Sequence, residues 1–179
     1  MYLPKIGADE TRIGVSIPVP EPWASEISQA RIGYGDEYAE MIPTHITIVG
    51  PTAVKINDIP AIIVQLDNAC DQIPKFQVTL EGTGTFRPIS PVSYINIVDG
   101  AADCANLAAR ANKGLLAQTA RFPYHPHVTL AHGVPEMVLD QAEADFAHLR
   151  ARFNADALWL YRHHDDGVWR KLCKFELRG

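Results

Sequence analysis

A short alternating pattern occurs twice in this chain, as His-Ile-Thr-Ile at residues 45–48 and as His-Val-Thr-Leu at residues 127–130. The alternation of polar and apolar residues predicts a β-strand for each copy. Because residues two positions apart on a strand point to the same side of a sheet, each copy presents an imidazole and a hydroxyl on one face. For one copy alone, an edge strand with a solvated polar face is the simpler explanation. Two copies favour a pair of strands that flank one common ligand, such as a phosphate group.

The apolar periodicity divides the chain into two halves with the same order of elements: strand, helix, His-x-Thr strand, helix, strand. In the first half these are residues 12–18, 22–31, 44–49, a helix after Asp58 with its buried side between residues 59 and 73, and 76–80. In the second half they are residues 93–98, 101–117, the second motif, a helix after Pro135, and strands 157–162 and 168–177. We therefore expect one domain over residues 1–179, with pseudo-twofold halves of roughly 1–88 and 89–179 that carry one motif each.

Composition limits the class of protein and its partners. The shares of hydrophobic and charged residues, 47% and 21%, are typical of globular domains, and the sequence contains neither a secretion signal nor an apolar run of membrane-spanning length. The net charge of −5 argues against binding along a nucleic-acid duplex and favours short or terminal nucleotides. Three widely spaced cysteines, Cys70, Cys104 and Cys173, predict a reduced, cytoplasmic protein. We also expect it to be a monomer.

The two motifs carry the residue types that phosphodiester cleavage needs. Of two imidazoles that face one phosphate near neutral pH, one can remove a proton from the attacking oxygen while the other protonates the leaving oxygen. The hydroxyls of Thr47 and Thr129 lie on the same strand faces and can donate hydrogen bonds to the nonbridging oxygens. Neither step requires a metal ion or another cofactor.

Paired His-x-Thr motifs within a duplicated chain resemble the 2H phosphoesterase superfamily, and more narrowly the bacterial 2'-5' RNA ligase or RNA 2',3'-cyclic phosphodiesterase group. The matching residues lie in segments 44–50, 84–86 and 125–133. The resemblance implies an α+β, bilobal fold in which antiparallel sheets line a central cleft and helices lie outside. It further implies metal-independent catalysis by His45 and His127, phosphate binding by Thr47 and Thr129, and opening of 2',3'-cyclic phosphates to 2'-phosphate products.

Four further residues are candidates for substrate binding. Tyr124 precedes the second motif and can stack on a base, although ordinary packing is an alternative. Tyr94 alternates with buried residues and either lines the cleft or faces solvent. Phe86 and Arg87 follow a glycine-rich segment and form either a loop lip that contacts substrate or a simple cover for the cleft.

A zinc site is an alternative use of the histidines, because His125 and His132 flank the second motif. No Cys, Asp or Glu lies at ligand spacing within either motif, so we expect no metal. The sequence therefore predicts a phosphodiesterase that hydrolyses 2',3'-cyclic or 2'-5' bonds of nucleotides or RNA ends, with no membrane partner. The alternatives are ligation of 2'-5' RNA ends and a nonenzymatic protein that binds a nucleotide or an RNA terminus.

Overall fold

The computed structural model describes residues 3–118 and 122–179, which form strands, helices and short 3-10 turns. The strands are β1 (Glu10–Pro18), β2 (His45–Lys55), β3 (Phe76–Thr85), β4 (Val92–Asp99), β5 (His127–His132), β6 (Arg150–Ala155), β7 (Ala157–His163) and β8 (Trp169–Glu176). The helices are α1 (Trp23–Gly33), α2 (Ile59–Cys70), α3 (Ala101–Ala111) and α4 (Glu136–Asp145). The 3-10 turns are Ile56–Asp58 and Gly114–Leu116.

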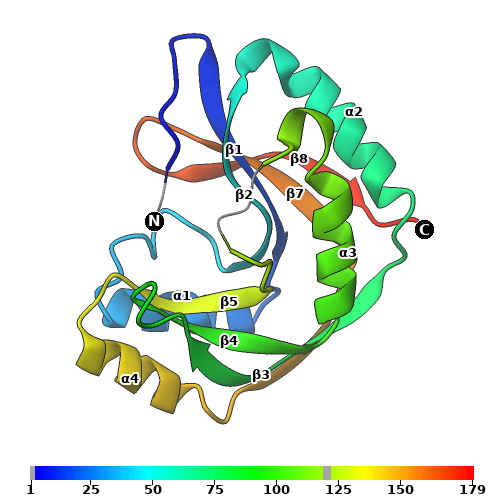
Figure 1. Ribbon diagram of the computed structural model, residues 1–179. Helices are drawn as coiled ribbons and strands as arrows, with labels where there is room; N and C mark the ends of the chain where they lie inside the picture. Colours follow the sequence, from blue (N-terminus) through cyan, green and yellow to red (C-terminus); the bar gives the residue numbers. More distant parts are fainter. Residues whose placement is uncertain (1–2, 119–121) are drawn as a thin grey trace.

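The eight strands found in the described residues form one curled, antiparallel sheet in the order β6-β3-β4-β5-β2-β1-β7-β8 (Figure 1). Its centre is the contact between β5 and β2, whose register contains the single residue pair Ile46↔Val128. Four strands lie on each side of this contact. The predicted α+β class with antiparallel strands is therefore confirmed, and the sheet is continuous across its middle.

The two four-strand groups do not coincide with the predicted halves, 1–88 and 89–179. Strand β3 belongs to the first half of the sequence but pairs with β4 and β6. Strands β7 and β8 belong to the second half but continue the sheet from β1. The order of elements along a chain does not determine which strands become neighbours, so a division at residue 88 does not describe this sheet.

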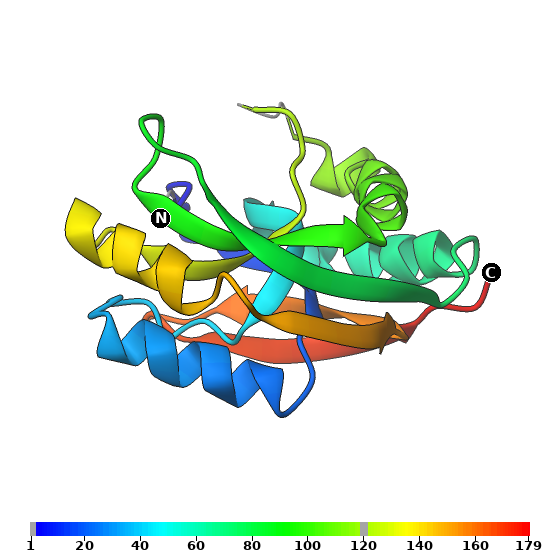
Figure 2. The same ribbon diagram turned by 90° about the horizontal axis from the view of Figure 1, so that it is seen from below.

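The helices pack on the strands in two pairs. Helices α2 and α3 contact each other, with α3 against β2 and α2 against β8, whereas α4 packs on β3, β4 and β5. Both views show α1 and α4 near one end of the sheet and α2 and α3 near the other (Figures 1 and 2). Apolar side chains from all four helices and both strand groups join one buried cluster. Among the described residues, no helix has the length and apolar character that crossing a membrane requires.

Most elements lie near their predicted positions, and four differ. Strand β3 continues past residue 80 to Thr85. Strand β2 continues beyond residue 49 to Lys55 although it contains Pro51. This proline lies at an irregularity in the pairing with β1, between the pairs Ile13↔Thr52 and Val15↔Val49, where a missing N–H is tolerated. The helix predicted for 101–117 ends at Ala111, before Gly114 adopts a positive φ of 50°. Strand β6 was not predicted, because its short run places small alanines at two of its three buried positions.

Candidate active site

The β2–β5 contact brings the two motifs together in register. In the antiparallel pairing of Ile46 with Val128, His45 lies opposite Thr129, and Thr47 lies opposite His127. Ile46 and Val128 are fully buried on the core side of the sheet, whereas the two histidines and two threonines are partly exposed on the other side. A slip of one residue would turn the imidazoles into the core, so burial of the aliphatic residues holds this register. All four predicted side chains therefore share one face.

Each motif imidazole is held by the same backbone contact. His45 Nδ1 lies 2.6 Å from the carbonyl oxygen of Pro43, and His127 Nδ1 lies 2.8 Å from the carbonyl oxygen of His125. A carbonyl oxygen only accepts, so Nδ1 carries the proton and donates in both rings. The neutral imidazoles therefore keep Nε2 as the basic nitrogen, and His45 Nε2 lies 3.0 Å from Thr47 Oγ1. The two imidazoles therefore have the same tautomer, and each can accept a proton at Nε2.

Burial disfavours the charged form of both imidazoles and so lowers their pKa values. Burial lowers the pKa of His45 to about 4; the Pro43 carbonyl opposes this shift, and the charges of Arg31 and His127 add to it. Burial also lowers the pKa of His127, against the effect of the His125 carbonyl. Both shifts favour the neutral form of the imidazole in the free protein. An anion bound between them would favour the protonated form of either ring.

Two of the predicted aromatic residues lie beside the second motif. The rings of Phe86 and Tyr94 are 4.4 Å apart, and the edge-on ring of Phe86 is 4.9 Å from that of His127. Tyr94 pairs in register with Thr129 and is 5.3 Å from the His127 ring. His125 completes this group, 5.1 Å from Tyr94. We call Phe86, Tyr94 and His125 the aromatic cluster. All three rings pack against the ring of His127.

Tyr124 links the two motifs. Tyr124 lies in the segment before β5, and its hydroxyl donates a 2.8 Å hydrogen bond to the carbonyl oxygen of Thr47 on β2. The residue is 39% exposed, so part of it still faces solvent. The segment before the second motif is thereby tied to the first motif. A role of this residue in stacking on a base stays a prediction.

A family model described as the 2'-5' RNA ligase superfamily matches residues 18–167, a range that contains both motifs and the aromatic cluster. The chain belongs to the 2'-5' RNA ligase superfamily. The resemblance to the 2H phosphoesterases predicted from the paired motifs is thus confirmed.

Several known proteins are similar to the chain over nearly its whole length. A protein of Staphylococcus aureus (strain Newman), named provisionally as a phosphoesterase, is 24% identical over 168 residues, which cover 92% of this chain and 98% of the relative. The crystal structure of Escherichia coli LigT complexed with 3'-AMP has a TM-score of 0.68 at 18% identity and covers 95% of this chain and 99% of LigT. The crystal structure of TT0787 from Thermus thermophilus has a TM-score of 0.63 at 19% identity and covers 94% and 98%. These structures show a shared fold.

In this 2'-5' RNA ligase superfamily member, a buried ion pair positions the loop before the first motif. Arg31 Nη2 lies 2.9 Å from Asp36 Oδ2, and the two side chains are 4% and 0% exposed. Arg31 also donates a hydrogen bond to the carbonyl oxygen of Ile42, next to the Pro43 carbonyl that holds His45. Sequence reasoning missed this pair, because neither residue lies in a motif and their contact depends on how the loop folds.

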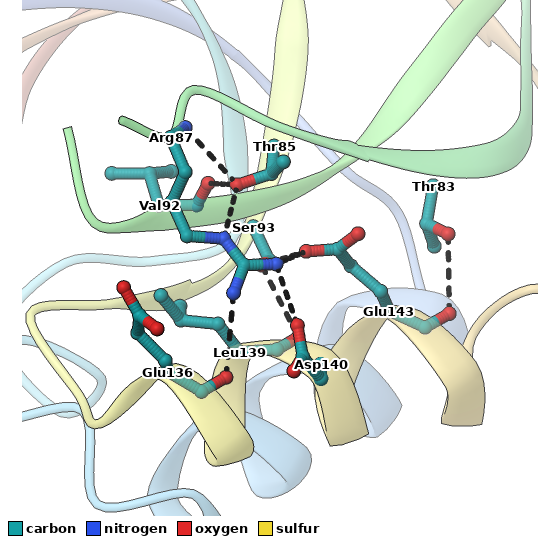
Figure 3. A network of polar contacts seen from close by, with 9 residues as sticks. All are labelled: Thr83, Thr85, Arg87, Val92, Ser93, Glu136, Leu139, Asp140 and Glu143. Carbon is teal, nitrogen blue, oxygen red and sulfur yellow. Dashed lines mark hydrogen bonds and ion pairs between the residues drawn. The ribbon is translucent and has the colours of Figure 1, made fainter. Parts of the chain in front are cut away.

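Arg87 is not brought together with the motif residues. Its guanidinium contacts α4, with Nη2 at 2.7 Å from Glu143 Oε1 and 2.8 Å from Asp140 Oδ1 (Figure 3). Its Nε donates to Thr85 Oγ1, and the same Glu143 oxygen lies 2.6 Å from Ser93 Oγ. The predicted substrate-binding residue instead ties the β3–β4 connection to α4, since two carboxylates one turn apart attract its charge.

The histidines around the second motif do not assemble a metal-ligand set. Within residues 3–118 and 122–179, no group of three or more His, Cys, Asp or Glu side chains is placed to hold a metal ion. His132 ends β5, and its ring stacks on Tyr38 at 5.5 Å. His125 packs edge-on against Phe86 at 5.5 Å.

Proposed function

We propose that this protein is a metal-independent phosphodiesterase that hydrolyses 2',3'-cyclic phosphodiesters of nucleotides or RNA ends to 2'-phosphates. Membership of the 2'-5' RNA ligase superfamily, and the provisional naming of the S. aureus relative as a phosphoesterase, support the coarser assignment of a phosphoesterase. The observation that supports the finer proposal is the in-register β2–β5 contact, in which the two imidazoles lie on neighbouring strands and each has the same backbone hydrogen bond. LigT, which shares the fold, binds 3'-AMP, a nucleoside monophosphate.

The reaction needs one base and one acid, and His45 and His127 supply them. One neutral imidazole takes a proton from water at Nε2 as the water oxygen bonds to phosphorus. The bond between phosphorus and the 3' oxygen breaks, and the other imidazole, protonated in the complex, gives its proton to that oxygen. The 2' oxygen keeps the phosphate. Thr47 and Thr129 donate hydrogen bonds to the nonbridging oxygens, where negative charge is greatest.

Hydrolysis is proposed over ligation because of what each direction must bind. Joining two RNA ends requires two polyanions side by side, and a chain with a net charge of −5 offers little attraction for both. Hydrolysis requires one cyclic phosphate and water. The neutral imidazoles of the free protein fit this demand, since only one of them has to become charged when the anionic substrate binds.

The test is turnover of 2',3'-cyclic AMP by protein treated with a chelator, with the position of the product phosphate read by phosphorus NMR. We expect adenosine 2'-phosphate, and a fall in kcat of about 10²–10⁴-fold in His45→Ala and in His127→Ala. His148→Ala, which alters an exposed histidine beyond α4, is the matched control and should keep wild-type activity.

Three outcomes would contradict the proposal. Undiminished activity in either motif variant would exclude the assigned pair of histidines. Binding of adenosine 2'-phosphate without turnover of any cyclic nucleotide would favour a nonenzymatic nucleotide-binding protein. Stoichiometric zinc in the purified protein, with loss of activity on chelation, would favour a metal-dependent hydrolase.

A further inference from the structure

The strand pair β3–β4 and its connection carry different groups on their two sides. Toward the second motif they present Phe86 and Tyr94, whose rings pack against the imidazole of His127. Toward α4 they present Arg87 and Ser93, which are the sequence neighbours of those two rings. Because neighbouring residues of an extended chain point to opposite sides, each ring is one residue away from a polar group that contacts α4.

One carboxylate oxygen on α4 contacts both of these polar groups. Glu143 Oε1 lies 2.7 Å from Arg87 Nη2 and 2.6 Å from Ser93 Oγ (Figure 3). Ser93 is fully buried, and the side chains of Arg87 and Glu143 are 22% and 25% exposed. Hydrogen bonds to an ionised acceptor are shorter and stronger than those between neutral groups. Glu143 therefore ties the chain next to Phe86 to the chain next to Tyr94.

Further contacts hold the backbone around the Phe86 ring. The backbone N–H and Nε of Arg87 donate to Thr85 Oγ1, at 3.2 Å and 3.1 Å. The N–H of Phe86 itself donates to the carbonyl oxygen of Val92 at 3.0 Å. The ring cannot leave the second motif without breaking these contacts.

The two rings also keep water from one side of the His127 imidazole. Tyr94 is only 8% exposed and lies over Gly84, where an added Cβ would be 2.9 Å from the tyrosine ring. Burial disfavours a charged imidazole, and it lowers the pKa of His127. Both the position and the protonation of His127 therefore depend on rings that are held from α4.

We propose that Glu143 is a positioning residue for His127. It acts through its two hydrogen bonds, which hold the rings that pack against the imidazole. This inference rests on the proposed function, in which His127 carries a proton, and adds a residue that lies outside both motifs. Glu143 acts on the site from the α4 side of the sheet. Such support matters because misplacement of a catalytic group by about 1 Å can cost about 10²-fold in rate.

The test measures the pKa of the His127 imidazole by NMR in the ligand-free protein, with its signal assigned by comparison with His127→Gln. In Glu143→Ala the rings lose their anchor and water reaches the imidazole, so the pKa should rise toward the ordinary value of 6.5. Loss of the negative charge alone would lower the pKa, because a nearby carboxylate favours a charged imidazole. The direction of the shift thus separates positioning from a direct effect of charge.

The groups around His127 allow a matched control. In the described part of the chain, the titratable groups that face it are His45 on β2, Tyr94 on β4 and His125 before β5, and Glu143→Ala changes none of them. Glu136→Gln removes a carboxylate from the same helix but leaves the backbone carbonyl that contacts the guanidinium. We expect this control to keep the wild-type pKa of His127.

Turnover gives a second readout. In Glu143→Ala, kcat for 2',3'-cyclic AMP should fall by about 10- to 10²-fold with little change in KM, because the imidazole is misplaced while the groups that bind substrate remain. Glu143→Gln keeps an oxygen that can accept both hydrogen bonds and should recover much of this loss.

Several results would overturn the inference. One is a pKa of His127 that stays at the wild-type value or falls in Glu143→Ala. Another is a change confined to KM, which would place the rings against the substrate. If Glu143→Ala does not fold, Phe86→Leu removes one ring without changing any charge, and an unchanged pKa in that variant also refutes the inference.

The titration needs no substrate, so its outcome is separate from that of the proposed function. A raised pKa in Glu143→Ala, in a protein whose wild type does not turn over cyclic nucleotides, would support the link between Glu143 and His127 and refute the hydrolysis. An unchanged pKa together with wild-type turnover of 2',3'-cyclic AMP would refute the positioning role alone.

Discussion

Removal of the Asp36 carboxylate should destabilise this protein strongly. Asp36 Oδ2 accepts hydrogen bonds from Arg31 Nε at 3.0 Å and Nη2 at 2.9 Å, and neither side chain is more than 4% exposed. In Asp36→Ala the Arg31 guanidinium stays in the same place. It loses both contacts with the carboxylate and keeps its hydrogen bond to the Ile42 carbonyl oxygen, at 3.2 Å. A buried cation that loses its counter-ion costs about 3–5 kcal/mol of unfolding free energy.

This loss is large for a single domain, whose total stability is typically about 5–15 kcal/mol. It also has a local consequence, because the loop held by the ion pair ends at Pro43, whose carbonyl orients the His45 imidazole. We therefore expect the folded fraction of Asp36→Ala to lose activity as well. An apolar replacement of both partners, Arg31→Met with Asp36→Leu, removes the buried charges together and should be close to wild type in stability.

Urea unfolding followed by tryptophan fluorescence measures these changes, with the slope m compared to confirm a two-state transition. The control is Asp166→Ala, which breaks an ion pair with Arg170 whose side chains are about half exposed. Solvent screens that pair, so the control should change the unfolding free energy little. If Asp36→Ala were no more destabilising than Asp166→Ala, the role assigned to the buried pair would be wrong.

Three further predictions concern the motifs. The pKa of His45 is lowered from 6.5 to about 4 in the folded protein, so between these pH values the unfolded chain binds a proton that the folded protein does not. The free energy of unfolding should therefore fall as the pH drops from about 6.5 to about 4. Urea midpoints measured across this range should depend less on pH in His45→Gln. Thr47→Val and Thr129→Val should each lower kcat/KM for 2',3'-cyclic AMP about 10²-fold, and unchanged kinetics would exclude phosphate binding by these hydroxyls. Tyr124→Phe should cost about 0.5–1.5 kcal/mol in urea unfolding through loss of its bond to the Thr47 carbonyl, and a wild-type midpoint would deny that link.

The parts of the fold that depend on local pattern were predictable. Alternation identified both motif strands and the face on which each imidazole lies, because side-chain direction in a strand follows from residue number. The apolar spacing of α2 located a helix that begins at Ile59. Strand β6 was missed because Arg150–Ala155 has little apolar bulk, and its place in the sheet depends on pairing with β3.

Contacts between distant residues were not predictable in the same way. The direction of Arg87 is decided by Asp140 and Glu143 on a helix that follows much later in the chain. The pairing of Arg31 with Asp36 depends on a loop that turns back on its own helix. Neither contact leaves a periodic signal, because loop conformation and helix docking determine which charges meet.

By itself, the sequence determined the chemical groups of the site and the faces on which they lie, since both follow from residue type and strand periodicity. Only the tertiary structure decided that Ile46 pairs with Val128, which sets each histidine opposite the threonine of the other motif. It also decided that the Tyr94 ring lies against Gly84 and the Trp169 ring against Gly14. The physical reason is that register and strand order result from burial across the whole sheet, a property that no segment carries alone.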